Sequence, residues 1–196
     1  HARWKEGGSR AAVLLGTRGV GKCVQAAGGL LQAVEDVDLA LGAGRTLGVV
    51  GESGCGKSTL GRTVLRLERP SAGQVLFRGE DISALGRRQL RSARRDMQMV
   101  FQDPYSSLDP RMTVFDLVAE PLREICRGLP RAQARERVLD TMELSGLPAE
   151  YADSYPHDLD RGRRQRVGRA RALVTGPQFV TTHEPRPALD VAIQPP

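Results

Sequence analysis

The chain is poor in aromatic residues, and this bounds what its positive charge can be used for. Phenylalanine, tyrosine and tryptophan make up 4% of the 196 residues, while the formal net charge is +6. Much of that excess lies in two arginine-rich runs, residues 87–95 and 161–171. Basic surfaces that bind nucleic acid usually carry aromatic side chains for base stacking, and neither run holds one. The sequence therefore favours solvated or partner-facing basic helices, with no nucleic acid as a partner.

The chain also lacks long apolar runs and a cysteine framework. No stretch approaches the ~20 apolar residues that span a bilayer, and the N-terminus does not resemble a secretory signal. Cys23, Cys55 and Cys126 are odd in number and lack metal-ligand spacing, which indicates a reduced cytosolic setting. A chain of this length can bury one core and a small second lobe.

Residues 47–59 (LGVVGESGCGKST) have the composition of a phosphate-binding loop between a strand and a helix. Three glycines let the backbone approach phosphate closely, and the following helix adds the partial positive charge of its N-terminus. Lys57 can reach the β- and γ-phosphates, and the Ser58 hydroxyl can ligate Mg²⁺. The sequence predicts a bound nucleoside triphosphate. The residues expected to contact it are Gly51, Glu52, Ser53, Gly54, Cys55, Gly56, Lys57, Ser58 and Thr59.

Residues 16–23 (GTRGVGKC) repeat the loop spacing nearer the N-terminus. Cys23 stands where the Mg²⁺-binding hydroxyl would be, and two glycines at 28 and 29 would interrupt a following helix. We interpret this match as chance and expect residues 1–32 to be a poorly defined N-terminal segment.

The remaining periodicity predicts alternating strands and helices, hence an α/β fold. We expect residues 33–103 and 176–196 to form the α/β core and residues 104–175 to form a helical subdomain that includes a signature segment. Strands are expected at 37–41, 46–50, 74–77, 97–101 and 178–182, and helices at 59–67, 84–95 and twice within 113–144.

Further motifs give the chain a specific resemblance. They are Val100-Phe101-Gln102-Asp103-Pro104, Tyr155-Pro156-His157-Asp158-Leu159, Arg164-Gln165-Arg166-Val167-Gly168, and Glu184-Pro185 followed by Ala188-Leu189-Asp190. In this order the chain resembles, over about residues 33–194, the ATP-binding subunit of an ABC transporter of the oligopeptide/dipeptide importer type. The resemblance implies a P-loop NTPase core of ABC type with an inserted helical subdomain.

The resemblance also implies roles for single residues. Gln102 matches a glutamine that contacts Mg²⁺ and the attacking water, and Glu184 matches the catalytic carboxylate that polarises that water. Asp190 matches an aspartate in a loop that crosses to a second ATPase. The implied cofactors are ATP and Mg²⁺, with Ser58 and Gln102 as metal ligands. Such a site neutralises phosphate charge and positions water, which is what phosphoryl transfer requires.

The motifs depart from the family at two places. His183 stands where an aspartate holds Mg²⁺, and imidazole is a poor ligand for this hard cation. The signature Leu-Ser-Gly-Gly-Gln reads Leu159-Asp160-Arg161-Gly162-Arg163. Asp160 brings negative charge toward the phosphate on the opposite subunit, whereas Arg161 either obstructs close approach or pairs with that phosphate. We therefore expect hydrolysis to be impaired.

The resemblance predicts further losses beyond these motifs. The C-terminal part of the cassette, with its switch histidine, is expected to be missing. No aromatic residue between 10 and 40 is placed to stack on adenine.

The implied function is ATP binding and hydrolysis that energises import of oligopeptides or dipeptides. The implied partners are a second ABC ATPase subunit, identical or different, integral membrane permease subunits and, indirectly, a solute-binding protein. The implied location is peripheral, on the cytoplasmic face of the cell membrane. Two alternatives stay open: a non-catalytic nucleotide-binding subunit, and a degenerate fragment with little hydrolysis. An ATPase of the DNA-repair ABC branch would carry a long coiled-coil insertion, which this chain lacks.

Overall fold

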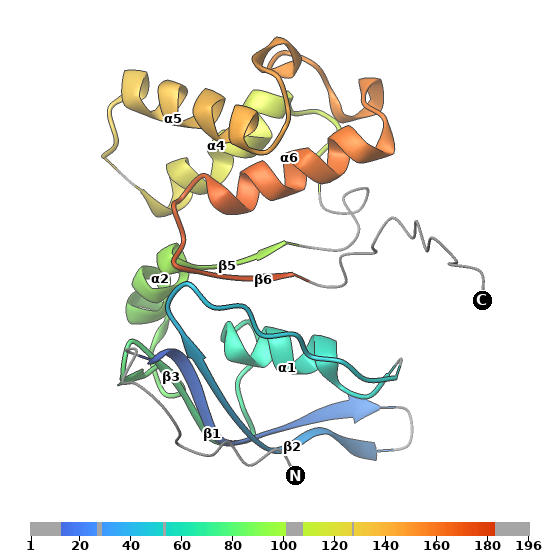
Figure 1. Cartoon of the computed structure of the whole chain (residues 1–196), viewed down its shortest axis with the longest axis vertical. Coiled ribbons are helices and arrows are strands. Elements are labelled where there is room, and N and C mark those ends of the chain that lie inside the picture. The colour runs from blue at the N-terminus through green and yellow to red at the C-terminus, as the bar shows by residue number, and fades with distance from the viewer. Residues whose placement is uncertain (1–12, 27–28, 53, 101–107, 127, 183–196) are drawn as a thin grey trace, which may run out of the picture.

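A computed structural model describes residues 13–26, 29–52, 54–100, 108–126 and 128–182. In Figure 1 a twisted sheet with one helix above it forms one end of the molecule, and a group of helices forms the other. The strands are β1 (Val13–Ala26), β2 (Gly29–Gly42), β3 (Ala72–Phe77), β4 (Glu80–Asp81), β5 (Met97–Val100) and β6 (Phe179–Thr182). The helices are α1 (Lys57–Val64), α2 (Arg87–Asp96), α4 (Val114–Ile125), α5 (Arg131–Leu144) and α6 (Arg161–Leu173), with short 3₁₀ turns at Ala149–Tyr151 and Pro156–Asp158.

The four strands β2-β1-β3-β4 form an antiparallel sheet, whereas β5 and β6 pair in parallel. Met97 lies opposite Phe179 and Val100 opposite Thr182, so strands about eighty residues apart are in register. A parallel pair needs a long crossover connection, and helices α4 to α6 supply it.

The buried side chains form two clusters. One joins the strands to α1 and includes Leu15, Val75 and Phe179. The other lies among α4, α5 and α6 and includes Leu117 and Val167. We call these parts the sheet lobe and the helical lobe. The expected division into α/β core and helical subdomain, with its boundaries, stays a prediction.

Helix α4 shows why the helical lobe forms from this sequence. The Thr113 hydroxyl accepts a hydrogen bond from the Asp116 amide at 3.2 Å and caps the helix. Val114, Leu117, Val118 and Leu122 recur at helical spacing, and all four are buried. These residues form the buried face of the helix.

The N-terminal segment is more ordered than we expected. Residues 13–26, assigned no element in the sequence analysis, form β1 at the centre of the antiparallel sheet. The expectation of a poorly defined segment over 1–32 is wrong for this stretch, although residues 1–12 lie outside the described part. Pairing with β2 and β3 stabilises β1. The periodicity of the local sequence does not reveal such pairing.

The strand expected at 46–50 is absent. Residues 45–50 adopt no regular structure, and the side chains of Leu47, Val49 and Val50 are 46%, 49% and 96% exposed. The Arg45 amide instead closes a turn on the Gly42 carbonyl at 3.2 Å. A strand needs a neighbour for its backbone groups, and the described strands offer this segment no pairing.

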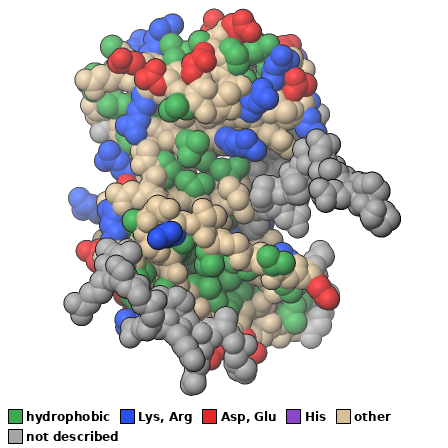
Figure 2. Space-filling view, viewed as in Figure 1, with side chains coloured by type: hydrophobic (Ala, Val, Ile, Leu, Met, Phe, Trp, Pro, Cys, Tyr) green, Lys and Arg blue, Asp and Glu red, His purple; other side chains and the backbone are tan. Residues whose placement is uncertain are grey.

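The two arginine-rich runs are the helices α2 and α6, and each is tied to α4. Arg91 of α2 lies 3.3 Å from the Glu124 carboxylate, and Arg171 of α6 lies 2.5 Å from Glu120. Figure 2 shows arginine and lysine side chains distributed around the surface together with acidic ones. Within the described residues no helix is long and apolar enough to cross a membrane.

Candidate nucleotide site

The phosphate-binding loop leads directly into α1. Gly54 and Gly56 have φ values of +81° and +93°, in the left-handed region that favours glycine. Gly56 is the N-cap, and its carbonyl accepts the Leu60 amide at 2.8 Å. Because Gly56 can adopt this conformation, α1 begins at Lys57, two residues before the predicted start.

The other end of α1 stops in a Schellman motif. The Arg66 amide donates to the Thr63 carbonyl and the Leu67 amide to the Arg62 carbonyl, both at 2.9 Å. Arg66 takes the left-handed conformation at φ +54° that glycine usually supplies there. The helix therefore ends at Val64, three residues before the predicted end.

Lys57 folds back into the loop. Its Nζ donates to the Gly51 carbonyl at 2.8 Å and the Glu52 carbonyl at 2.5 Å, and it lies 3.6 Å from the Cys55 Sγ. The ammonium group is therefore held at the loop rather than extended into solvent. A phosphate placed there would meet this charge together with the free N–H groups that begin α1.

Two loop glycines lie where a Cβ would overlap a neighbouring atom, and at Gly56 that atom belongs to the backbone. A Cβ on Gly51 would lie 2.6 Å from the Cys55 Sγ, and a Cβ on Gly56 would lie 2.0 Å from the Ala33 carbonyl oxygen. The second contact is with the backbone of β2, which cannot rotate away as a side chain can. Gly56 thus fixes the start of α1 against the sheet.

The first turn of α1 contains no acidic residue, so the positive end of the helix is not neutralised from within. Ser58 is exposed in that turn. Within the described residues no three His, Cys, Asp or Glu side chains form a cluster that could hold a metal ion. The Ser58 hydroxyl is an oxygen donor of the kind that Mg²⁺ prefers, and this ion takes few protein ligands when it binds through substrate phosphates and water.

The altered signature begins α6. Asp160 is its N-cap and accepts the Arg163 amide at 2.7 Å, while the Arg163 guanidinium lies 2.9 Å from the same carboxylate. The backbone hydrogen bond from Arg163 is the largest cause that lowers the pKa of Asp160 below its ordinary value, aided by the charge of Arg163. Arg163 also lies over the Tyr151 ring at 4.6 Å. Asp160 therefore caps α6, and its charge is offset locally by Arg163.

The structure brings together Gly51, Glu52, Gly54, Cys55, Gly56, Lys57, Ser58 and Thr59 of the predicted site residues. Ser53, Gln102, His183, Glu184 and Asp190 lie outside the described residues. Their predicted roles stay predictions.

Sequence reasoning missed the contacts that β1 and β2 make with α1. Ala33 meets Gly56 at one end of the helix, and Lys22 meets Glu68 and the Arg69 carbonyl beyond the other. In the sequence, Lys22 stands out only as part of a chance match to the loop spacing. The signal that could have found it is a lysine placed in a strand whose other members are largely apolar or small.

An α/β sheet lobe with a phosphate-binding loop, joined to a helical lobe between β5 and β6, defines a P-loop nucleotide-binding cassette. Residues 34–186 match the family model described as ABC transporter, and the chain belongs to that family. This confirms the resemblance drawn from the motifs.

Two curated relatives are peptide transport proteins. The chain is 47% identical to the oligopeptide transport ATP-binding protein OppF of Bacillus subtilis (strain 168) over 167 residues, 85% of this chain and 55% of that protein. It is 43% identical to a putative peptide import ATP-binding protein of Brucella ovis over 182 residues, 92% of this chain and 57% of the relative. The chain spans about half the length of the curated relatives it matches.

Solved structures agree on the fold. The dimeric MJ0796, a bacterial ABC transporter cassette, has a TM-score of 0.80 at 30% identity, covering 90% of this chain and 76% of that one. CbiO1 from Clostridium perfringens has a TM-score of 0.76 at 26% identity, covering 91% and 68%. A further MJ0796 structure, with the same TM-score of 0.80, 30% identity and coverage of 90% and 76%, is bound to ADP and Pi.

Proposed function

We propose that this chain binds and hydrolyses ATP as the subunit that energises import of oligopeptides or dipeptides across the cell membrane. The observation that carries the proposal is the phosphate-binding loop, in which Lys57 is held at the carbonyls of Gly51 and Glu52 beside the start of α1. The named functions of the peptide transport relatives support the substrate class.

The described residues can bind phosphate by three means. Lys57 supplies a full positive charge, the loop and the first turn of α1 supply backbone N–H donors, and the α1 dipole adds partial charge. Ser58 would give the Mg²⁺ ion its one protein hydroxyl, with Gln102 as a second ligand. Bound Mg²⁺ neutralises phosphate charge.

For hydrolysis we propose Glu184 as the base that polarises the attacking water and Gln102 as the residue that orients it. A carboxylate and an amide next to a charged phosphate are suited to positioning water without forming a covalent intermediate. His183 next to Glu184 weakens the metal site, because imidazole is a poor magnesium ligand.

We further propose that the cassette works as a pair, with an identical or a different second ATPase, on the cytoplasmic face of the membrane. The dimeric state of MJ0796 supports the pairing. Integral permease subunits would receive the motion, and a solute-binding protein would deliver the peptide to them.

A second candidate function is nucleotide binding without turnover. The local structure of α6 favours it, because Asp160 and Arg163 pair with each other at the helix start where the family has a serine and a glutamine. In a pair of cassettes this segment would face the partner's nucleotide with an ion pair. The Asp160 carboxylate repels phosphate and engages both the Arg163 amide and its guanidinium, so this segment would bind phosphate less well than a hydroxyl and free backbone N–H groups.

Titration of the purified chain with a fluorescent ATP analogue, with and without Mg²⁺, tests the first step. We expect saturable binding that Lys57→Ala abolishes, whereas Arg131→Ala, which removes one exposed charge from α5, leaves affinity unchanged. Absence of binding by the unaltered chain would refute the proposal.

Binding by the unaltered chain without phosphate release favours the second candidate. If His183→Asp with Asp160→Ser then fails to increase turnover, these two residues are not the cause.

A further inference from the structure

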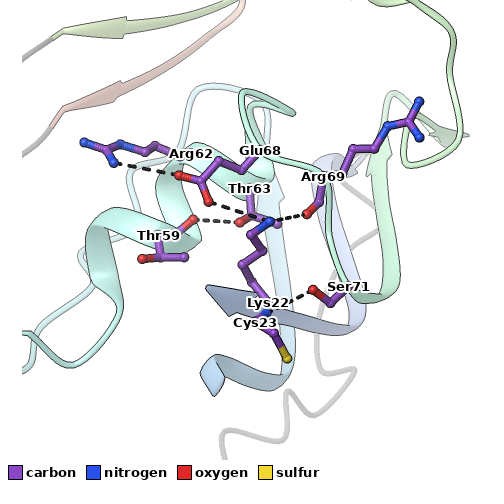
Figure 3. Close-up of polar contacts among 8 residues, drawn as sticks. All are labelled: Lys22, Cys23, Thr59, Arg62, Thr63, Glu68, Arg69 and Ser71. Atoms are coloured by element: carbon purple, nitrogen blue, oxygen red, sulfur yellow. Dashed lines mark hydrogen bonds and ion pairs between the residues drawn. The ribbon is translucent and has the colours of Figure 1, made fainter. Parts of the chain in front are cut away.

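The loop-like motif at residues 16–23 belongs to β1, and its lysine has a different task from Lys57. Figure 3 shows the Lys22 side chain reaching from β1 to the segment that follows α1. Its Nζ donates to the Arg69 carbonyl at 3.0 Å and lies 3.8 Å from a Glu68 carboxylate oxygen. The other Glu68 oxygen lies 3.7 Å from Arg62, in the last turn of α1. Lys22 is thereby linked to the helix itself.

The Lys22 contact is partly shielded from water. The side chains of Lys22 and Glu68 are 17% and 30% exposed, compared with 52% for Arg62. An ammonium group that is mostly covered and hydrogen-bonded to a carbonyl holds its geometry more strongly than an ion pair in open solvent. Lys22 is thus suited to fix the position of the segment that it touches.

Backbone contacts on both sides of Lys22 reinforce the attachment. The Ser71 amide donates to the Gly21 carbonyl at 2.8 Å, and the Cys23 amide donates to the Ser71 hydroxyl at 3.0 Å. Three consecutive residues of β1 therefore hold the segment after α1. Figure 3 shows the Lys22 contact with Arg69 and the Cys23 contact with Ser71.

The start of α1 lies against the hairpin next to the residue pair that contains Lys22. Lys22 pairs with Val34 in the register of β1 and β2, and Ala33, next to Val34, is the residue that Gly56 approaches. A helix of eight residues is about 12 Å long. The helix start therefore lies against one short stretch of the β1–β2 hairpin, and the segment after the helix end is bonded to the same stretch. These two contacts together restrict the direction of the helix axis.

We propose that Lys22 is a positioning residue for nucleotide binding: by holding the end of α1 to β1, it sets the direction in which the helix start and Lys57 face the phosphates. This inference rests on the proposed function of the loop. Lys22 precedes residues 34–186, which the family model matches. Its partners Glu68 and Arg69 lie within the matched segment, so the attachment joins a strand before that segment to the chain inside it.

The test compares three variants by amide hydrogen exchange without nucleotide and by affinity for the fluorescent ATP analogue. Lys22→Met keeps the aliphatic stem and removes the charge, and Lys22→Arg restores it. Arg123→Met is the control, because it removes an ion pair with Asp116 in α4 of the helical lobe, far in sequence from the loop.

For Lys22→Met we expect faster exchange in α1, unchanged exchange in α4 and α5, and about three- to tenfold weaker nucleotide affinity. This is the range of one ordinary intramolecular hydrogen bond, since Lys22 acts on the nucleotide only through the helix. Lys22→Arg should lie close to the unaltered chain in both measurements. Arg123→Met should leave α1 exchange and affinity unchanged.

Unchanged α1 exchange in Lys22→Met would overturn the inference, and so would a general increase in exchange across both lobes. If Lys22→Met does not fold, Glu68→Gln tests the ion-pair link to the helix, because it removes the pairs with Lys22 and Arg62 and keeps the bond from Lys22 to the Arg69 carbonyl. Unchanged α1 exchange in Glu68→Gln would then overturn the inference. If the unaltered chain binds no nucleotide, the proposed function fails, while the exchange pattern still decides whether Lys22 positions α1.

Discussion

Replacement of Gly56 by alanine tests how the loop is held to the sheet. The residue has φ +93°, and the new Cβ would lie 2.0 Å from the Ala33 carbonyl oxygen and 3.2 Å from the Ala33 carbonyl carbon. A non-glycine residue in the left-handed region costs about 1–2 kcal/mol. Forcing a methyl group into a packed position typically adds about 1–3 kcal/mol, because the backbone must move. Together we expect the free energy of unfolding to fall by about 2–5 kcal/mol.

Gly54→Ala is a matched control in the same loop. Gly54 has φ +81°, and a Cβ there would meet no atom within 4 Å. It carries the backbone cost without the overlap, so the difference between the two variants, about 1–3 kcal/mol, measures the contact with Ala33 alone. Urea unfolding followed by circular dichroism gives both values. Equal midpoints for Gly54→Ala and Gly56→Ala would refute the close approach of α1 to β2.

Three further outcomes follow from the packing and charge of other sites. Gly73→Ala places a Cβ 2.1 Å from the Gly19 carbonyl oxygen at φ +74°, so urea unfolding should show a loss of about 2–5 kcal/mol, with nucleotide affinity unchanged in the folded fraction. Leu117→Ala removes a buried side chain from the helical lobe and should cost about 2–5 kcal/mol in the same assay; a loss under about 1 kcal/mol would contradict its place in the core. The pKa of Asp116 lies below its ordinary value, chiefly because Arg123 donates a hydrogen bond to it. The Asp116 carboxylate therefore stabilises the fold above its unfolded pKa of 3.8, and this contribution is lost as pH falls through the folded pKa. In Asp116→Asn the free energy of unfolding should therefore fall less steeply as the solution is made acidic.

The elements that depend on neighbouring residues can be predicted from the sequence. The glycine spacing of the phosphate-binding loop predicted that a helix follows the loop. Helix α1 does so, although it begins two residues before the predicted start because Gly56 can adopt a positive φ. The apolar residues of α4 recur every three or four positions, and the structure buries that face. These features are local, since backbone sterics and helical periodicity act over a few residues.

Which segments become strands, and which groups each charged side chain contacts, depends on residues far apart in the sequence. Residues 13–26 lack a clear pattern yet form β1, whereas the apolar segment 46–50 forms no strand. Strand formation depends on a partner far along the chain, and local sequence does not specify that partner. The same reason explains Lys22: its sequence neighbours imitate a phosphate-binding loop, but its contacts lie 46 and 47 residues away, at Glu68 and Arg69.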